Sequence, residues 1–214
     1  MADTTSLRNS SLAECARRAF DLLFSLLLLI GGSPLFLLIG WSIYCTSPGP
    51  IFYSQLRIGK GGKPFRMYKF RTMQENAEHL LTTLLERSLE REKEWNTFRK
   101  LRNDPRVTPF GRFLRKTSLD ELPQFWNVLL GDLSVVGPRA MLQAELQECQ
   151  DATAEQILSI KPGITGLWQV SGRHTLRLEE RWKLEKEYVA KRSFLFDLWL
   201  IVRTLPSVFL GKGL

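Results

Sequence analysis

Residues 22–45 read LLFSLLLLIGGSPLFLLIGWSIYC, an apolar run of the chain without a charged side chain. As one continuous helix, this run would extend about 36 Å, which is enough to cross the hydrocarbon core of a bilayer. A secretory signal would have a shorter apolar core followed by a cleavage site with small residues, but this run continues through Trp41. The sequence therefore predicts a retained membrane anchor.

The middle of the run contains residues that interrupt helices. Gly31 and Gly32 are followed by Ser33 and Pro34, and a proline inside a helix removes a backbone donor and clashes with the preceding turn. Basic residues flank both ends of the run, so the positive-inside rule does not place these ends on opposite sides of a membrane. Two arrangements fit: a re-entrant helix that turns back at the break, and a kinked helix that spans once.

Composition sets the class of the remaining chain. The 214 residues are enough for one sizeable core, so one catalytic domain is expected. The net charge of +8 favours anionic partners such as lipid headgroups, phosphorylated substrates or nucleic acid. Cys15, Cys45 and Cys149 are far apart and lack Cys-x-x-Cys spacing, so the sequence predicts neither a disulfide framework nor a zinc site.

The segment after the anchor combines strands with amphipathic helix. Residues 51–70 predict a hairpin of two strands around Gly59-Lys60-Gly61-Gly62. Leucines recur at helical spacing over residues 76–101, which predicts an amphipathic helix or helix pair. We interpret these leucines as core residues without a chemical role.

The C-terminal third predicts a loop followed by two helices. Residues 161–173 contain three glycines and a proline, which indicates a structured loop rather than a helix. A charged helix follows over residues 178–188. Residues 193–202 are apolar but too short to span a membrane and contain Asp197, so they fit either an interfacial helix or a buried core helix.

The densest set of chemically useful side chains lies in RKTSLDELPQFWNVLLGDLSVVGPRA, residues 115–140. Asp120 and Glu121 are adjacent, Arg115 and Lys116 precede them, and Arg139 follows Gly137-Pro138. A reaction on a pyrophosphate needs a carboxylate as nucleophile or metal ligand, and cations that hold phosphate oxygens. This segment supplies both kinds of group.

A purely structural interpretation of the same residues is also open. Ser118-Leu119-Asp120-Glu121 has the spacing of a capping box, with Ser118 as N-cap and Glu121 at the third helical position. The two interpretations compete for Asp120 and Glu121. A helix N-terminus would also help to keep Asp120 ionised, as a nucleophilic carboxylate must be.

Five motifs are spread over nearly the whole chain: Ser33-Pro34, SPGPIFYSQLRIG at 47–59, YKFRTM at 68–73, SLDELPQFWNVLLGDLSVVGPR at 118–139 and KPGITGLWQVSGR at 161–173. Together they resemble the motifs of the monotopic polyprenyl-phosphate phosphoglycosyl transferases, the bacterial sugar transferase family. The resemblance implies an α+β, mainly α fold: a helical catalytic domain with a β-hairpin, interfacial amphipathic helices and an N-terminal re-entrant membrane helix. Residues 1–46 would form that membrane helix, and residues 47–214 a transferase domain on the cytoplasmic face of the inner membrane.

The resemblance also implies a reaction. Members of this family transfer a sugar 1-phosphate from a UDP-sugar to undecaprenyl phosphate, release UMP, and pass through a covalent aspartyl-phosphosugar intermediate. Asp120 would be the nucleophile and a Mg²⁺ ligand, and Glu121 the supporting carboxylate. The residues expected to bind substrate phosphates are Lys69, Arg115, Arg139 and Arg173.

The sequence departs from the family pattern at one position near the candidate site. Ala140 stands where the family usually has a proline, and this change bears on the geometry of the nucleotide pocket. The form of the 161–173 motif favours glucose or galactose over an acetamido sugar, and a homodimer is compatible with the sequence. A nucleic-acid-binding protein would leave Asp120 and Glu121 unexplained, so nucleic acid is not expected as a partner. An inactive scaffold of a glycan assembly machine is the remaining alternative.

Overall fold

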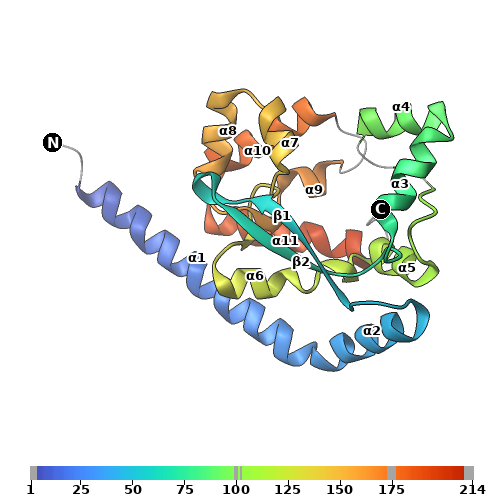
Figure 1. Cartoon of the computed structure of the whole chain (residues 1–214). Helices are drawn as coiled ribbons and strands as arrows, with labels where there is room; N and C mark the ends of the chain where they lie inside the picture. The colour runs from blue at the N-terminus through green and yellow to red at the C-terminus, as the bar shows by residue number, and fades with distance from the viewer. Residues whose placement is uncertain (1–3, 99–100, 102, 173–176, 210–214) are drawn as a thin grey trace.

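The structure is a computed structural model of the whole chain (Figure 1), and it describes residues 4–98, 101, 103–172 and 177–209. Helices α1 (Thr4–Gly31) and α2 (Ser33–Thr46) run along the lower edge of the molecule in Figure 1, with the β-hairpin and the remaining helices above them. The fold is mainly helical with little β-structure, as predicted. The two-stranded hairpin is its longest sheet among the described residues.

The N-terminal helix pair is bent at the predicted position. The axes of α1 and α2 differ by 60° across a break at Gly32, and Ser33 Oγ donates to the carbonyl oxygen of Ile30. Pro34 lies in the first turn of α2, where its missing N–H removes no helical hydrogen bond. In the described part of the chain no helix taken alone has the length and apolarity of a membrane span, whereas Leu12–Gly31 and Ser33–Thr46 have them as a bent pair.

The predicted hairpin is confirmed. Strands β1 (Phe52–Ile58) and β2 (Pro64–Phe70) pair antiparallel, and the short 3-10 turn η1 (Lys60–Gly62) joins them. Gly61 and Gly62 have φ angles of 68° and 75°, a left-handed conformation that favours glycine. The buried side chain of Asn127 accepts from the N–H of Tyr68 and donates to the carbonyl oxygen of Arg66, which fixes β2 on helix α6.

The leucine-rich segment forms two helices, α3 (Ala77–Glu86) and α4 (Leu89–Phe98), so a helix pair is confirmed. The interpretation of its leucines as core residues is wrong for the helices themselves. No residue of α3 is buried, and Leu89 is exposed, although Leu101 beyond α4 is buried. Because α3 and α4 pack mainly on each other, their apolar faces are only half covered.

The remaining elements surround a second, parallel strand pair formed by β3 and β4. They are α5 (Pro109–Thr117), η2 (Leu119–Glu121), α6 (Gln124–Leu130), β3 (Ser134–Val136), α7 (Gln143–Glu148), α8 (Asp151–Leu158), β4 (Gly163–Thr165), α9 (Leu167–Ser171), α10 (Leu178–Lys191) and α11 (Phe194–Phe209). The charged helix predicted over residues 178–188 is confirmed as α10. The loop predicted over residues 161–173 is wrong in part, because this segment contains β4 and α9. Gly163 and Gly166 of this segment lie in close contact with the backbone of Gly137.

The predicted helix at residues 193–202 combines the two alternatives that the sequence left open. Leu200 is fully buried and Asp197 is buried, so one face of α11 belongs to the core. On the other face Leu195 is 78% exposed and Val202 is 62% exposed. This helix therefore contributes both to the core and to an apolar surface.

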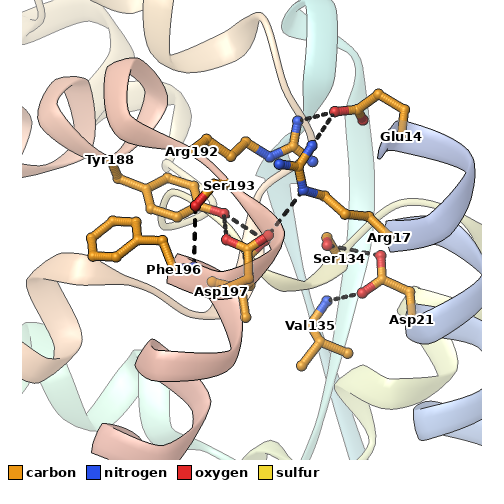
Figure 2. Close-up of polar contacts among 11 residues, drawn as sticks. Glu14, Arg17, Asp21, Ser134, Val135, Tyr188, Arg192, Ser193, Phe196 and Asp197 are labelled. Carbon is orange, nitrogen blue, oxygen red and sulfur yellow. Dashed lines mark hydrogen bonds and ion pairs between the residues drawn. The ribbon is translucent and has the colours of Figure 1, made fainter. Parts of the chain in front are cut away.

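Two buried aspartates fix α1 to the domain (Figure 2). Asp21 accepts hydrogen bonds from Ser134 Oγ (2.8 Å) and from the N–H of Val135 (3.0 Å). Asp197 of α11 accepts from Arg17 Nε at 3.0 Å and from the Tyr188 hydroxyl at 2.7 Å. Buried carboxylates are tolerated because these donors satisfy them. The N-terminal helix is therefore attached to the rest of the domain by polar as well as apolar contacts.

Candidate active site

The two adjacent carboxylates lie on a 3-10 turn between two helices. Helix α5 ends at Thr117, and Ser118 follows it with a left-handed φ of 57°. The side chain of Ser118 makes no capping hydrogen bond, so the predicted capping box is wrong. An N-cap residue needs extended backbone, but Ser118 is instead the C-cap of α5. Asp120 and Glu121 are thus held by the turn η2, and the catalytic interpretation does not compete with a cap.

Of the two carboxylates, Asp120 is the more deeply buried, with only 7% of its surface exposed. Burial, and more weakly the charge of Glu121, raise the pKa of its carboxyl, whereas Lys69 and Arg115 lower it; the net result is a pKa of about 6. At neutral pH the carboxylate is therefore ionised but poorly solvated. Such a group combines a negative charge with weak hydration, which suits a nucleophile.

Lys69 and Arg115 bring positive charge to Asp120 from two other elements. Lys69 of β2 donates to Glu121 Oε1 at 2.7 Å, and both side chains keep partial contact with solvent. Arg115, in the last turn of α5, donates from Nε to Thr72 Oγ1 at 2.9 Å. Burial lowers the pKa of Arg115, and the charge of Asp120 raises it. The structure thus brings together four of the residues predicted from sequence.

Arg139 approaches the same group from the end of β3. Its backbone N–H donates to Glu185 Oε1 at 3.0 Å, and its guanidinium lies 5.3 Å from the centre of the Trp168 ring. Burial lowers the pKa of Arg139, while Glu145 and, more weakly, Glu121 raise it. Arg139 is therefore within electrostatic range of Glu121.

The remaining residues that the sequence analysis singled out do not take part in this carboxylate and cation group. Arg173 falls outside the residues that the structure describes, so its predicted contact with substrate phosphate remains a prediction. Ser33 and Pro34 are the first two residues of α2 and directly follow the break at Gly32 in the N-terminal helix pair. Ala140, which replaces the usual proline of the family, is buried, and its carbonyl oxygen accepts from Arg57 Nη1 at 3.2 Å.

Asp120 and Glu121 are the carboxylates of this site that could hold a metal ion. The described residues contain no group of three or more His, Cys, Asp or Glu side chains placed to hold a metal. Mg²⁺ keeps several waters and is held through one or two carboxylates together with substrate phosphates. Asp120 with Glu121 offers this arrangement next to the cations that would hold phosphate.

Sequence reasoning missed several residues beside this site. Arg57 of β1, Glu145 of α7 and Arg181 of α10 converge near Arg139, and the ring of Trp168 lies against Arg139 and Arg181. Their separation along the chain hides this arrangement, because no local spacing links β1 with α10. Arg57 does lie within the 47–59 motif quoted above, which was the available signal.

Comparison with known proteins identifies the family. The family model described as "Bacterial sugar transferase" matches residues 12–211. The chain belongs to this family. The prediction made from its motifs is thereby confirmed, and the chain is a transferase.

Individual bacterial sugar transferases match over most of this chain. The exopolysaccharide production protein ExoY of Sinorhizobium fredii is 44% identical, with 92% of this chain and 87% of the relative covered. An undecaprenyl-phosphate galactose phosphotransferase of Salmonella typhimurium is 42% identical over 92% of this chain and 41% of its own length. A UDP-glucose:undecaprenyl-phosphate glucose-1-phosphate transferase of Escherichia coli is 35% identical over 95% and 42%, respectively.

Proposed function

We propose that this bacterial sugar transferase moves a sugar 1-phosphate from a UDP-sugar to undecaprenyl phosphate and releases UMP. This would be a first membrane step in the synthesis of a bacterial exopolysaccharide, O-antigen, capsule or glycoprotein glycan. The names of the relatives in Salmonella typhimurium and Escherichia coli support the reaction. The observation that carries it for this chain is the buried carboxylate of Asp120, which Glu121, Lys69 and Arg115 surround.

The reaction proceeds in two displacements. Asp120 Oδ attacks the β-phosphorus of the donor; the bond between this phosphorus and the bridging oxygen breaks, and the oxygen leaves with UMP. The phosphosugar on Asp120 is then attacked by an oxygen of the lipid phosphate, which regenerates the carboxylate. Lys69 and Arg115 lie where cations offset the charge on the transferred phosphoryl group.

Mg²⁺ is the cofactor of this proposal. Asp120 and Glu121 would hold the ion, which would offset negative charge on the phosphates of the substrate and of the leaving group. Lys69 pairs with Glu121, so one of the two carboxylates that would hold the ion also keeps a cation at the site.

UMP release by the full chain in nanodiscs tests the proposal. The assay contains Mg²⁺, undecaprenyl phosphate and a panel of UDP-sugars that includes UDP-glucose, UDP-galactose and their acetamido counterparts. We expect release to require both the metal and the lipid and to favour UDP-glucose or UDP-galactose. If no UDP-sugar gives UMP while the protein stays folded in the membrane, the chain acts as a scaffold and the proposal is wrong.

The kcat/KM for the UDP-sugar should fall as the pH drops below the pKa of Asp120, because Asp120 becomes protonated. The nucleophile must be ionised, and burial raises its pKa to about 6. Each unit of pH below this value lowers the ionised fraction, and thus kcat/KM for the donor, about tenfold. A rate profile between pH 5 and 8 checks this result. A profile that stays flat down to pH 5 would contradict the environment assigned to Asp120.

We also place the chain on the cytoplasmic face of the inner membrane, with α1 and α2 as a re-entrant pair. Leu27, Leu37 and Trp41 expose most of their apolar surface on these two helices, and α11 adds the exposed Leu195 and Val202. A monomeric soluble protein rarely exposes so many large apolar side chains on neighbouring helices. The lipid interface would cover them.

Two natural cysteines distinguish a re-entrant pair from a single span. Cys15 of α1 and Cys45 of α2 are exposed and lie on opposite sides of the break, whereas Cys149 is buried. In intact spheroplasts we expect a membrane-impermeant maleimide to label neither Cys15 nor Cys45, and to label both after lysis. Cys15→Ser and Cys45→Ser variants assign the signals. Labelling of one of them before lysis would show that the pair crosses the membrane.

A further inference from the structure

Three arginines from distant parts of the chain gather around one carboxylate beside the candidate active site. Arg181 Nη2 donates to Glu145 Oε1 at 2.9 Å, and Arg57 Nη1 lies 3.8 Å from Glu145 Oε2. Arg139 completes the group, because the ring of Trp168 lies 5.3 Å from its guanidinium and 5.5 Å from that of Arg181. We call Arg57, Arg139 and Arg181 the arginine cluster.

The described carboxylates next to the arginine cluster do not balance its positive charge. Glu145 supplies one negative charge against three guanidinium groups, and Glu121, which acts on Arg57 and Arg139 more weakly, is itself paired with Lys69. Another carboxyl, that of Glu185, is 2% exposed, and burial raises its pKa to about 7, so it carries only part of a charge at neutral pH. Burial and the neighbouring charge of Arg139 lower the pKa of Arg57 to about 10. Excess positive charge that is poorly solvated favours the binding of an anion.

The arginine cluster also has donors to spare. Among the described residues, Nε of Arg57 and Nε of Arg139 are buried without a hydrogen-bond partner. A buried donor without a partner is costly, and a guanidinium fork matches the geometry of phosphate oxygens. A phosphate group would satisfy both the charge and these donors.

Electrostatics relate the arginine cluster to the reacting atoms. Lys69 and Arg115 are the cations that lower the pKa of Asp120, the nucleophile. The charge of Glu121, by contrast, raises the pKa of Arg57 and of Arg139. Glu121 also pairs directly with Lys69 at 2.7 Å, so it adjoins both groups of cations, which would place two phosphates of one substrate side by side.

We propose that the arginine cluster is a second phosphate subsite that binds the α-phosphate of the donor, the group that leaves with the nucleotide. In it Arg57 and Arg181 act as binding residues beside Arg139, and Glu145 acts as a positioning residue. When the bond from the β-phosphorus breaks, its electron pair stays on the bridging oxygen, which becomes a terminal oxygen of UMP. The cluster offsets the negative charge that develops on this oxygen. This proposal rests on the proposed function.

Substitution of Arg181 tests the subsite in the full chain. We expect Arg181→Gln to raise the KM for the UDP-sugar and the inhibition constant of added UMP by about tenfold or more, because a charge-assisted phosphate contact is lost. The KM for undecaprenyl phosphate should change less than about twofold. Arg181→Lys keeps the charge but loses the two-pronged hydrogen-bonding geometry of the guanidinium, so it should raise the same two constants by an intermediate factor. Lys183→Gln, an exposed change on the same helix, is the matched control.

Each outcome has a definite meaning. If Arg181→Gln raises the KM for the lipid instead, the cluster serves the acceptor phosphate and the proposal is wrong. Unchanged constants in a folded variant would show that the cluster is structural; if Arg181→Gln does not fold, Arg181→Lys decides by the same criteria. Calorimetry of UMP binding separates the phosphate subsite from the proposed function. If the wild-type chain binds UMP, loses this affinity in Arg181→Gln and yet shows no turnover, the subsite is retained and the proposed function is wrong.

Discussion

The Asp120→Asn variant is expected to lose turnover by at least about 10⁴-fold and at the same time to become more stable. The loss follows because an amide oxygen cannot replace the carboxylate as nucleophile. The gain follows from burial, which raises the pKa of Asp120 from 3.8 to about 6 and so disfavours its ionised form in the folded chain. At pH 7 the neutral amide should raise the free energy of unfolding by roughly 1 to 3 kcal/mol.

The sign of this stability change can be checked with pH. A carboxyl whose pKa is raised by folding favours the folded state below its unfolded pKa of 3.8 and loses this contribution as pH rises through about 6. The Tm difference between variant and wild type should therefore be largest at pH 7 and vanish near pH 4. Mass spectrometry after incubation with the donor should find the phosphosugar adduct on wild type alone.

A matched control for this variant is Asp151→Asn, at an exposed position in the first turn of α8. It removes the same charge away from the candidate site and should keep nearly all activity. An Asp120→Asn chain with turnover above about one per cent of wild type would contradict the nucleophilic role, since such a loss corresponds to less than about 3 kcal/mol of transition-state stabilisation.

The sequence predicts those parts of the fold whose signals are local. Gly59-Lys60-Gly61-Gly62 between β-rich runs is enough to predict the hairpin, because the left-handed φ angles of its turn favour glycine. Gly32, Ser33 and Pro34 predict the break between α1 and α2 for a similarly local reason. A proline clashes with a preceding turn of helix wherever it lies, so no distant contact is needed to form the break.

The errors arise where tertiary contacts override a local pattern. The spacing of Ser118 and Glu121 satisfies a capping box, but α5 ends on Ser118 and holds it in a left-handed conformation that an N-cap cannot adopt. The glycine content of residues 161–173 predicts a loop, whereas the segment contains β4 and α9. Gly163 and Gly166 are needed there because β4 and the start of α9 pass directly over the backbone of Gly137.

The candidate site was predictable in the same uneven way. Asp120 and Glu121 are adjacent and lie in a dense motif, so their role could be predicted without a structure. The roles of Arg57 and Arg181 could not be predicted, since 124 positions separate these two residues and only the fold brings both to Glu145. Contacts of this kind depend on the packing of whole elements, about which periodicity along the chain carries no information.

The Gly163→Ala variant is expected to be the most destabilising single methyl addition in the described part of the chain. The added Cβ would overlap the backbone nitrogen of Gly137 and would lie 2.6 Å from the Cα of Gly137 and 2.6 Å from the carbonyl oxygen of Thr165. All three are backbone atoms of the β3–β4 pair and its edge, so no side chain can rotate away. The strands must separate, and the hydrogen bond from the Gly163 N–H to the carbonyl oxygen of Pro138, at 2.8 Å, must break.

Such a separation should cost about 4 kcal/mol or more of unfolding free energy and lower the Tm by roughly 10 °C or more, or prevent folding altogether. It should also reach the active site, because Arg139 follows Gly137 by two residues and β3 sets its position. Any folded fraction is therefore expected to bind UMP more weakly than wild type.

Gly40→Ala in α2, whose Cβ would meet the Ile51 side chain at an ordinary 3.5 Å, is the matched control and should leave the Tm unchanged or slightly higher. Thermal unfolding of both variants in nanodiscs measures the effect. A Gly163→Ala chain as stable as Gly40→Ala would mean that β3 and β4 are not in the direct backbone contact on which the position of Arg139 depends.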